Sequence, residues 1–249
     1  MTTLPREPVP PSDLAAAYGA AAEREVRRTQ QGVSVVGYKI GYTNMRVWND
    51  LGITAPMWGV MYDDSVIDAG DHPFRYDASA LHGPRIEPEI VVHFFKSPAI
   101  GATMEELLDC VDWVAPGFEI VISLPDGKPA TVTQAITNGG MHGALLVGAR
   151  LPVAELGSQA VRSLGDIRVE LRCDGELKEA GSSANVLDHP LSAIIQLMEG
   201  LQREGMAPVK AGDTITTGTM TAAYDVMPGQ RWTATLAGAP LAGLNVTFE

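Results

Sequence analysis

The chain of 249 residues is short of cysteine, of basic side chains and of long apolar runs, and each shortage excludes a class of protein. Its two cysteines, Cys110 and Cys173, lie far apart in the sequence, so we expect buried free thiols rather than a disulfide or a metal pair. With 18 Lys and Arg against 30 Asp and Glu, the net charge of −12 opposes binding to nucleic acids and to anionic membranes. No apolar run approaches the roughly 20 residues that a membrane-spanning helix needs.

The N-terminal segment lacks the apolar core of a secretion signal. Residues 1–11 are instead rich in proline and are expected to form an extended arm, and we expect a cytoplasmic protein. The remaining composition, with 45% hydrophobic and 19% charged residues, is that of a globular protein long enough to form a full core.

The segment Arg85–Val92 alternates charged and apolar residues before it becomes wholly apolar. Alternation along a strand places Arg85, Glu87 and Glu89 on one face. Two carboxylates about 7 Å apart at the backbone repel each other unless a cation lies between them, and Mg²⁺ or Mn²⁺ prefers such oxygen ligands. A solvated strand face is the alternative interpretation. Pro88 cannot donate a hydrogen bond to a neighbouring strand, which predicts a sheet edge or a bulge.

A second apolar segment, Phe118–Ile122, contains one charged residue, Glu119. A carboxylate inside an apolar strand is costly to bury unless it is paired or bound to a cation. Glu119 is therefore the third candidate ligand, and it comes from a different element than the first two. Three carboxylates completed by water or substrate form an ordinary Mg²⁺ site.

The β-branched segment Val33–Thr43 is expected to be a strand, and it contains the candidate active-site residue Lys39. Gly37 and Gly41 share a strand face with Lys39 and are expected to leave open space around its ammonium, where a ligand could approach. An exposed strand lysine is the alternative.

Two turn or loop segments contribute further candidates. Asp63 and Asp64 follow a strand and are typical of a turn, and Asp64 is kept as a candidate catalytic residue. The glycine-rich segment 138–143 lacks the spacing of a phosphate-binding loop. Its His142 could contact a ligand, although a lone loop histidine is more often structural or exposed.

Helical signals occur in four places. Expected helices run from Ser12, as the cap, to about Gln31, over 44–52 as a cover, from the capping box at Thr103 to about Val114, and from Pro190 to about Gly205. A hairpin is expected over 167–178, with its turn at Asp174-Gly175, and strands close the chain after residue 230.

Six segments, in this order, resemble the fumarylacetoacetate hydrolase superfamily and, within it, the group of 2-keto-4-pentenoate hydratases and 4-oxalocrotonate decarboxylases. They are Gly37–Gly41, Trp58–Asp64, Arg85–Ile90, Phe118–Val121, Val186–Leu191 and Lys210–Thr219. The resemblance covers nearly the whole chain from about residue 12. It departs from the family pattern at Ile122, where the family often has Asp, and in segment 138–143, which replaces an Asp-Asn segment.

The resemblance implies an α+β fold with a mixed β-roll core and a helical N-terminal part. Residues 1–70 would form the N-terminal part and 71–249 the catalytic β-roll of one functional unit. It also implies Glu87, Glu89 and Glu119 as ligands of Mg²⁺ or Mn²⁺ and Lys39 as an active-site lysine. The full set of candidates adds Asp64 to Lys39 as catalytic residues, and gives Lys39, Arg85 and Thr219 as substrate-binding residues. A homo-oligomer is expected, with association to another enzyme of the same pathway as a further expectation.

The implied chemistry is metal-dependent lyase chemistry on a small 2-oxo acid through a stabilised dienolate, by hydration or by decarboxylation. Three carboxylates and a divalent ion leave one negative charge in excess, so nearby cations are required, and Lys39 and Arg85 are the candidates. Lys39 is also a candidate acid or base. One alternative is a C–C bond hydrolase of an acylpyruvate or 1,3-diketone, although the N-terminal part has no His-x-x-Glu pair. The other is a non-catalytic partner subunit with the same fold.

Overall fold

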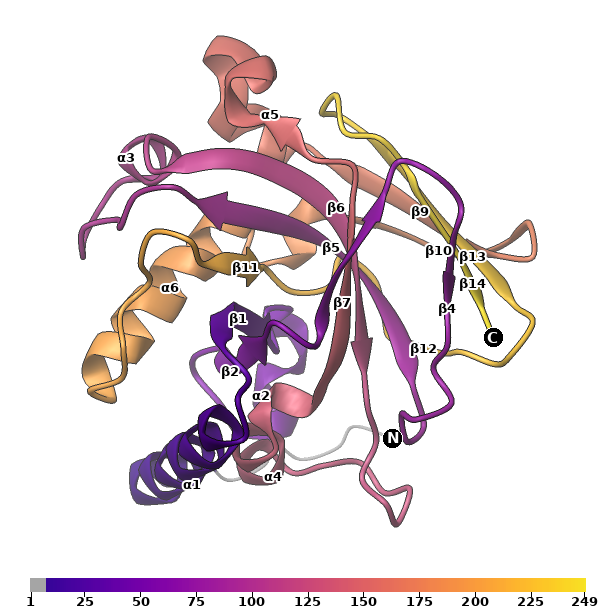
Figure 1. The fold of residues 1–249 in the computed structure, drawn as a ribbon. Coiled ribbons are helices and arrows are strands. Elements are labelled where there is room, and N and C mark those ends of the chain that lie inside the picture. The colour runs from indigo at the N-terminus through magenta and orange to yellow at the C-terminus, as the bar shows by residue number, and fades with distance from the viewer. Residues whose placement is uncertain (1–7) are drawn as a thin grey trace.

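The computed structural model describes residues 8–249, in which two sheets are surrounded by helices (Figure 1). The larger sheet follows the order β2-β1-β11-β5-β6-β7-β3, and β12 and β8 pair with β5 and β6. Its strands are β1 (Val35–Gly41), β2 (Met57–Tyr62), β3 (Val66–Gly70), β5 (Arg85–Phe94), β6 (Val111–Val121), β7 (His142–Gly148), β8 (Leu151–Pro152), β11 (Thr214–Thr216) and β12 (Tyr224–Asp225).

The smaller sheet has five strands in the order β10-β9-β13-β14-β4. They are β4 (Phe74–Tyr76), β9 (Arg168–Cys173), β10 (Glu176–Ser182), β13 (Arg231–Ala237) and β14 (Leu244–Phe248). The expected hairpin is β9–β10, and its two turn residues, Asp174 and Gly175, both have positive φ, at 51° and 85°. This is the backbone that a two-residue hairpin requires, which explains the Asp-Gly pair.

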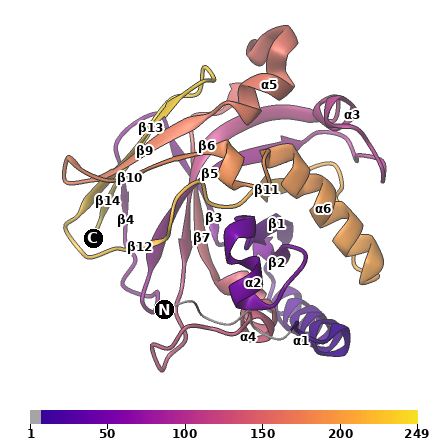
Figure 2. The ribbon, with the colours of Figure 1, turned by 180° about the vertical axis from the view of Figure 1, so that it is seen from behind.

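The helices lie mainly around the larger sheet. They are α1 (Pro11–Gln30), α2 (Trp48–Leu51), α3 (Met104–Leu108), α4 (Val132–Thr137), α5 (Ala160–Gly165) and α6 (Pro190–Arg203), with short 3-10 turns η1 (Met45–Val47), η2 (Gly139–Met141), η3 (Val153–Gln159) and η4 (Ser183–Asn185). Viewed from behind, α1 and α6 lie on the side of the molecule away from the smaller sheet (Figure 2). No helix in residues 8–249 is both long and apolar enough to cross a membrane.

Packing at α1 and α6 follows from their apolar faces. The α6 residues at helical spacing are buried, as the periodicity predicted, and His189 caps the helix by accepting from Leu191 N. Helix α1 packs against α4, and its Tyr18 stacks on Trp58 of β2 at a ring separation of 4.2 Å. These contacts hold the β1–β2 pair, which carries Lys39, against the helical layer.

Two helix boundaries differ from the expectation. Ser12 is not a cap, because α1 already begins at Pro11 and shows no side-chain cap. The capping box at Thr103 is confirmed, but α3 ends at Leu108 and the chain enters β6 at Val111. The residues from Val111 onward pair with β5, so sheet pairing overrides the helix expected there.

The prediction that Pro88 marks a sheet edge or a bulge is wrong. Strand β5 lies inside the sheet and pairs with β6 without a register shift at Pro88. On its other side β12 pairs only up to Ile86 and β11 begins only at Val91, so Pro88 lies in the gap between them. The carbonyl of Pro88 accepts a hydrogen bond from Met220 N on that side. In an antiparallel strand the N–H and the C=O of one residue point to the same side, so the N–H that proline lacks would also have pointed into the gap. The missing N–H therefore costs no ladder bond.

The α+β architecture with a helical N-terminal segment is confirmed. Strands β1, β2 and β3 come from the first 70 residues, yet they belong to the same sheet as β5, β6 and β7. The boundary near residue 70 therefore does not separate two sheets. Residues 1–7 of the expected N-terminal arm lie outside the described residues.

Candidate active site

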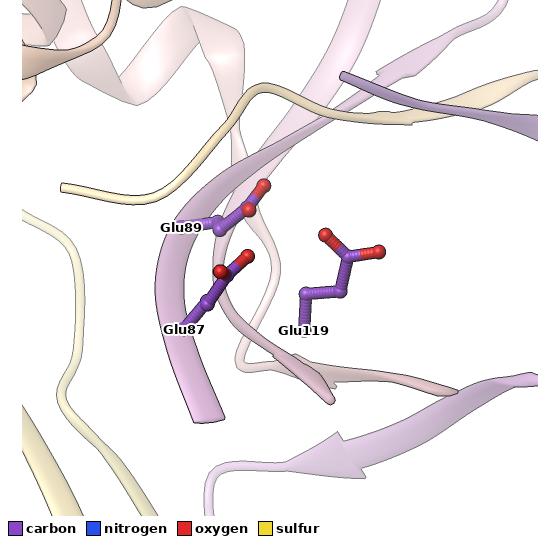
Figure 3. Close-up of side chains that lie close together, drawn as sticks. All are labelled: Glu87, Glu89 and Glu119. Atoms are coloured by element: carbon purple, nitrogen blue, oxygen red, sulfur yellow. The ribbon is translucent and has the colours of Figure 1, made fainter. Parts of the chain in front are cut away.

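Three carboxylates meet where β5 and β6 run side by side. Glu87 lies directly opposite Glu119 in the antiparallel register, and Glu89 lies two residues further along β5. Figure 3 shows the three side chains directed toward one another from the two strands. One oxygen of each lies within 4.8 Å of the others. The strand pattern therefore placed Glu87 and Glu89 correctly, and the pairing of β5 with β6 adds Glu119.

Glu89 is held by one oxygen and left open at the other. Its Oε2 accepts from the backbone N–H of Gly218 at 2.7 Å and from the hydroxyl of Thr216. Its Oε1 is buried and has no hydrogen-bond partner among the described residues. An oxygen in this state is costly unless a cation binds it. The residues present thus fit a divalent ion with hard oxygen ligands.

The pKa values of the three acids reflect the electrostatic cost of burying them close together. Burial raises the pKa of Glu87 to about 7, although Lys39 opposes the rise. Burial, and then the charges of Glu119 and Glu87, raise the pKa of Glu89 well above its ordinary value. Burial would also raise the pKa of Glu119, but Lys39 and His142 outweigh it and hold this pKa below the ordinary value. A bound divalent ion would compete with protons at Glu87 and Glu89.

Lys39 is buried and paired with an acid of this group. Its ammonium lies 2.9 Å from Glu119 Oε2 and donates to the carbonyl of Gly140 at 3.1 Å, and the residue is 2% exposed. Burial alone would lower the pKa of Lys39, but Glu119, Glu87 and Glu89 raise it to about 12. Lys39 is thus a fixed positive charge, and the alternative of an exposed strand lysine is excluded.

The glycines beside Lys39 have a different role from the one expected. A Cβ on Gly37 would lie 1.8 Å from the carbonyl oxygen of Thr214, and one on Gly41 would lie 2.5 Å from the end of Met57. They are needed for close packing rather than for open space. The glycine that accommodates the Lys39 side chain is Gly140, where a Cβ would lie 2.5 Å from Lys39 Cδ.

His142 contacts the three-carboxylate cluster, although the sequence interpretation favoured a structural or exposed loop histidine. Its Nδ1 lies 2.9 Å from Glu119 Oε1 and its Nε2 lies 3.0 Å from Ser65 Oγ. With Nδ1–H as donor to the carboxylate and Nε2 as acceptor from Ser65, both ring nitrogens are satisfied. His142 therefore fixes the orientation of Glu119. The pairing of β7 with β6 brings His142 to Glu119, and the sequence of segment 138–143 alone does not reveal that pairing.

A cavity of about 380 Å³ is lined by Glu87 of the three carboxylates and has the size of a small-molecule site. Strands β1 and β5 contribute Lys39, Arg85 and Glu87 to its wall, and the smaller sheet and the segment after β11 contribute Glu179 and Thr219. The segment expected as a cover also lines it, through Asn44, Arg46 and Val47. Apolar side chains such as Met57, Val121 and Met141 complete the lining.

The structure brings together most of the predicted site residues but not Asp64. Lys39, Arg85 and Thr219 line the cavity together with Glu87 of the three-carboxylate cluster (Glu87, Glu89 and Glu119, called the metal group in the proposals below). Asp64 lies instead in the exposed turn between β2 and β3, where its carboxylate pairs with Arg28 at 2.8 and 2.9 Å. Geometry therefore gives Asp64 a partner in α1 and no contact with the cavity.

Comparison with known proteins places the chain in a family. The model for the C-terminal domain of fumarylacetoacetate (FAA) hydrolase matches residues 39–244, so the chain belongs to this family. A 4-oxalocrotonate decarboxylase from Pseudomonas putida is 32% identical over 92% of this chain and 84% of the relative. A 2-keto-4-pentenoate hydratase from Paraburkholderia xenovorans is 30% identical over 90% of this chain and 80% of the relative.

Solved structures agree with the sequence relatives. The 4-oxalocrotonate decarboxylase from Pseudomonas putida G7, complexed with magnesium and adipate, matches with a TM-score of 0.84 and 28% identity, over 95% of this chain and 86% of that one. The same decarboxylase complexed with calcium and acetate matches with a TM-score of 0.82. The family resemblance and the fold that it implied are thus confirmed.

Proposed function

We propose that this protein is a divalent-metal-dependent lyase of small 2-oxo acids, a hydratase of the 2-keto-4-pentenoate type or a decarboxylase of the 4-oxalocrotonate type. The observation that carries the proposal is the convergence of Glu87, Glu89 and Glu119 on one point beside a cavity that also contains Lys39. Relatives at 30–32% identity with these two activities support the same reaction class.

The proposed cofactor is Mg²⁺ or Mn²⁺, held by Glu87, Glu89 and Glu119. Bound there, the ion would act as a Lewis acid that stabilises negative charge on substrate oxygens. The unpartnered Oε1 of Glu89 and the all-carboxylate donor set support this assignment. The relative crystallised with magnesium agrees with it.

The protein side chains would set the charge and the orientation of the substrate. Three carboxylates, a divalent ion and Lys39 together carry no net charge, so Lys39 removes the excess negative charge that would repel a carboxylate substrate. Arg85 would then bind that carboxylate, because its Nε is buried without a hydrogen-bond partner in the described residues and its side chain lines the cavity. Thr219, which also lines the cavity, is the proposed third substrate contact.

One experiment separates the two lyase reactions. The protein with Mg²⁺ is incubated separately with 2-hydroxypenta-2,4-dienoate and with 4-oxalocrotonate, while dienol absorbance and CO₂ release are followed. Formation of the 4-hydroxy-2-oxo acid from the dienol without CO₂ identifies a hydratase, and CO₂ release from 4-oxalocrotonate identifies a decarboxylase. Absence of metal-dependent turnover with either compound would contradict the proposed function. Repeating the assay with Mn²⁺ decides between the two ions.

Assembly and location extend the proposal. We propose that the protein is a cytoplasmic homo-oligomer that also associates with another enzyme of the same pathway. Light scattering should give a mass that is a multiple of 26.5 kDa at micromolar concentration. A mass of one chain would contradict the oligomer.

A further inference from the structure

One carboxylate in the cavity wall does not belong to the metal group. Glu179 lies on β10 of the smaller sheet, whereas Glu87, Glu89 and Glu119 lie on β5 and β6 of the larger one. Its side chain is partly buried and lines the same cavity as Lys39 and Glu87. The cavity therefore has a carboxylate on a wall that a different sheet provides.

Glu179 is held in place by one oxygen. Its Oε2 accepts from the backbone N–H of Ala222 at 2.9 Å and from the hydroxyl of Tyr224 at 3.0 Å. Its Oε1 has no hydrogen-bond partner among residues 8–249, and Glu179 forms no ion pair with a Lys, Arg or His there. The carboxylate is thus oriented by two donors, while one oxygen remains free to accept a proton.

The other ionisable groups that line the cavity are less suited to proton transfer. Lys39 is committed to Glu119 and to the carbonyl of Gly140. Arg46 and Arg85 keep their protons at all ordinary pH values. Glu87 belongs to the metal group, and a phenol such as Tyr42 is ordinarily protonated near neutral pH and does not serve as a base there. Glu179 is the remaining carboxylate of the lining.

Resting on the proposed function, we propose that Glu179 is the general base for the addition of water to the substrate carbon chain. A 2-oxo acid held at the three carboxylates by its carboxylate and C2 oxygen would direct its carbon chain into the cavity, which Glu179 also lines. The wall that contains Glu179 is made by other elements, so the chain would approach it. This assignment favours hydration as the reaction of this site.

The step balances without a further reactant. The substrate is the 2-oxo-3-enoate that forms when the dienol loses its C2 hydroxyl proton and gains a proton at C5. Glu179 takes a proton from water as the water oxygen bonds to C4, and the C3–C4 π electrons move toward C2 and its oxygen as an enolate. The carboxylic acid of Glu179 then returns the proton to C3. The product is the 4-hydroxy-2-oxo acid, and Glu179 is again a carboxylate.

The test variant is Glu179→Gln, whose amide oxygen can still accept from Ala222 N–H and the Tyr224 hydroxyl but cannot serve as the base. The substrate is 2-hydroxypenta-2,4-dienoate with saturating Mg²⁺, and NMR follows the 2-oxo-3-enoate and the 4-hydroxy-2-oxo acid separately. We expect kcat for the hydrated product to fall roughly 10²-fold or more, with loss of the dienol retained. Affinities for Mg²⁺ and for oxalate should stay within about threefold.

Two further variants separate catalysis from structure. Glu176→Gln is the matched control, since Glu176 lies on the same strand but is exposed and paired with Lys178, and it should leave turnover unchanged. Glu179→Ala should regain part of its lost activity when formate is added, because a small carboxylate can replace the missing base but cannot replace a structural contact.

Each result decides the matter. If the hydration rate of Glu179→Gln lies within about threefold of that of the unmodified protein, the inference is overturned. It is also overturned if Glu179→Ala loses Mg²⁺ and oxalate binding and formate does not restore that binding. If the unmodified protein releases CO₂ from 4-oxalocrotonate and hydrates nothing, the assignment of Glu179 fails while the lyase function stands. If it turns over neither compound, the proposed function itself fails.

Discussion

The substitution Lys39→Met keeps most of the buried stem and removes its charge, so it tests the ion pair at the centre of the site. Lys39 Nζ lies 2.9 Å from Glu119 Oε2, and the two side chains are 3% and 0% exposed. At an effective dielectric constant of about 20, unit charges at that separation attract by about 6 kcal/mol. Part of this repays desolvation, and breaking a buried pair costs about 3–5 kcal/mol. We expect a loss of that size in the unfolding free energy of the metal-free protein.

The loss should depend on pH, and its sign follows from Glu119. Burial would raise the pKa of Glu119 above its ordinary value of 4.5, but Lys39 and His142 hold it lower. A lowered pKa stabilises the fold above the unfolded-state value, and this contribution is lost as pH falls through the folded-state value. Without Lys39, burial dominates and the pKa of Glu119 rises. The variant should therefore be penalised most above about pH 7 and least near pH 5.

The assay is urea or thermal unfolding in the presence of a chelator, at several pH values. For a chain of this length, 3–5 kcal/mol corresponds to a fall in Tm of roughly 6–20 °C. Lys128→Met is the control, because the Lys128 side chain is 79% exposed beside Asp126 and should contribute less than about 1 kcal/mol. A loss below about 1 kcal/mol for Lys39→Met at pH 7, or a loss that does not change with pH, would refute this account of the pair.

With Mg²⁺ and the best substrate, Lys39→Met should also lower the turnover rate roughly 10²-fold while Mg²⁺ still binds. Lys39→Arg should not restore the turnover rate, because a planar guanidinium differs in shape from an ammonium. Near-normal steady-state kinetics of Lys39→Met would contradict this prediction. Glu87→Gln should weaken Mg²⁺ binding at least about tenfold in calorimetry. The same variant should raise the Tm of the metal-free protein at pH 7. Burial raises the pKa of Glu87 to about 7, so ionisation of the native carboxylate lowers the stability of the fold. Gly140→Ala should lower Tm by several degrees, since Gly140 has a φ of 72° and a Cβ would meet Lys39; an unchanged melting curve would exclude this strain.

Local sequence patterns determined the strands that carry the three carboxylates. Alternation along Arg85–Val92 placed Glu87 and Glu89 on one face, because successive strand side chains point to opposite sides. A single acid in an otherwise apolar strand marked Glu119 for the same energetic reason that makes it costly to bury. The Asp174-Gly175 turn and the α6 periodicity were also readable, since turn geometry and helical spacing are set by nearby residues.

Contacts between distant segments were decided only by the tertiary structure. The environment of Pro88 depended on how β11 and β12 share one side of β5, which no local pattern encodes. His142 became part of the site because β7 pairs with β6, and Glu179 because the smaller sheet supplies a cavity wall. Asp64 lies in the turn between β2 and β3 and pairs with Arg28 of α1, a contact that only the folded chain forms.

The sequence by itself therefore determined which side chains share a face and which acids need a cation. The order of the strands decided which strand faces lie next to each other. It also decided that the glycines near Lys39 are needed for close packing, and that Glu87 and Glu179, from different sheets, line the same cavity. The physical reason is the sequence separation of the interacting residues. Side-chain periodicity is fixed by the local backbone. Ion pairs such as Lys39–Glu119 and the walls of the cavity join residues that are far apart in the sequence, so these interactions form and contribute free energy only once the chain has folded.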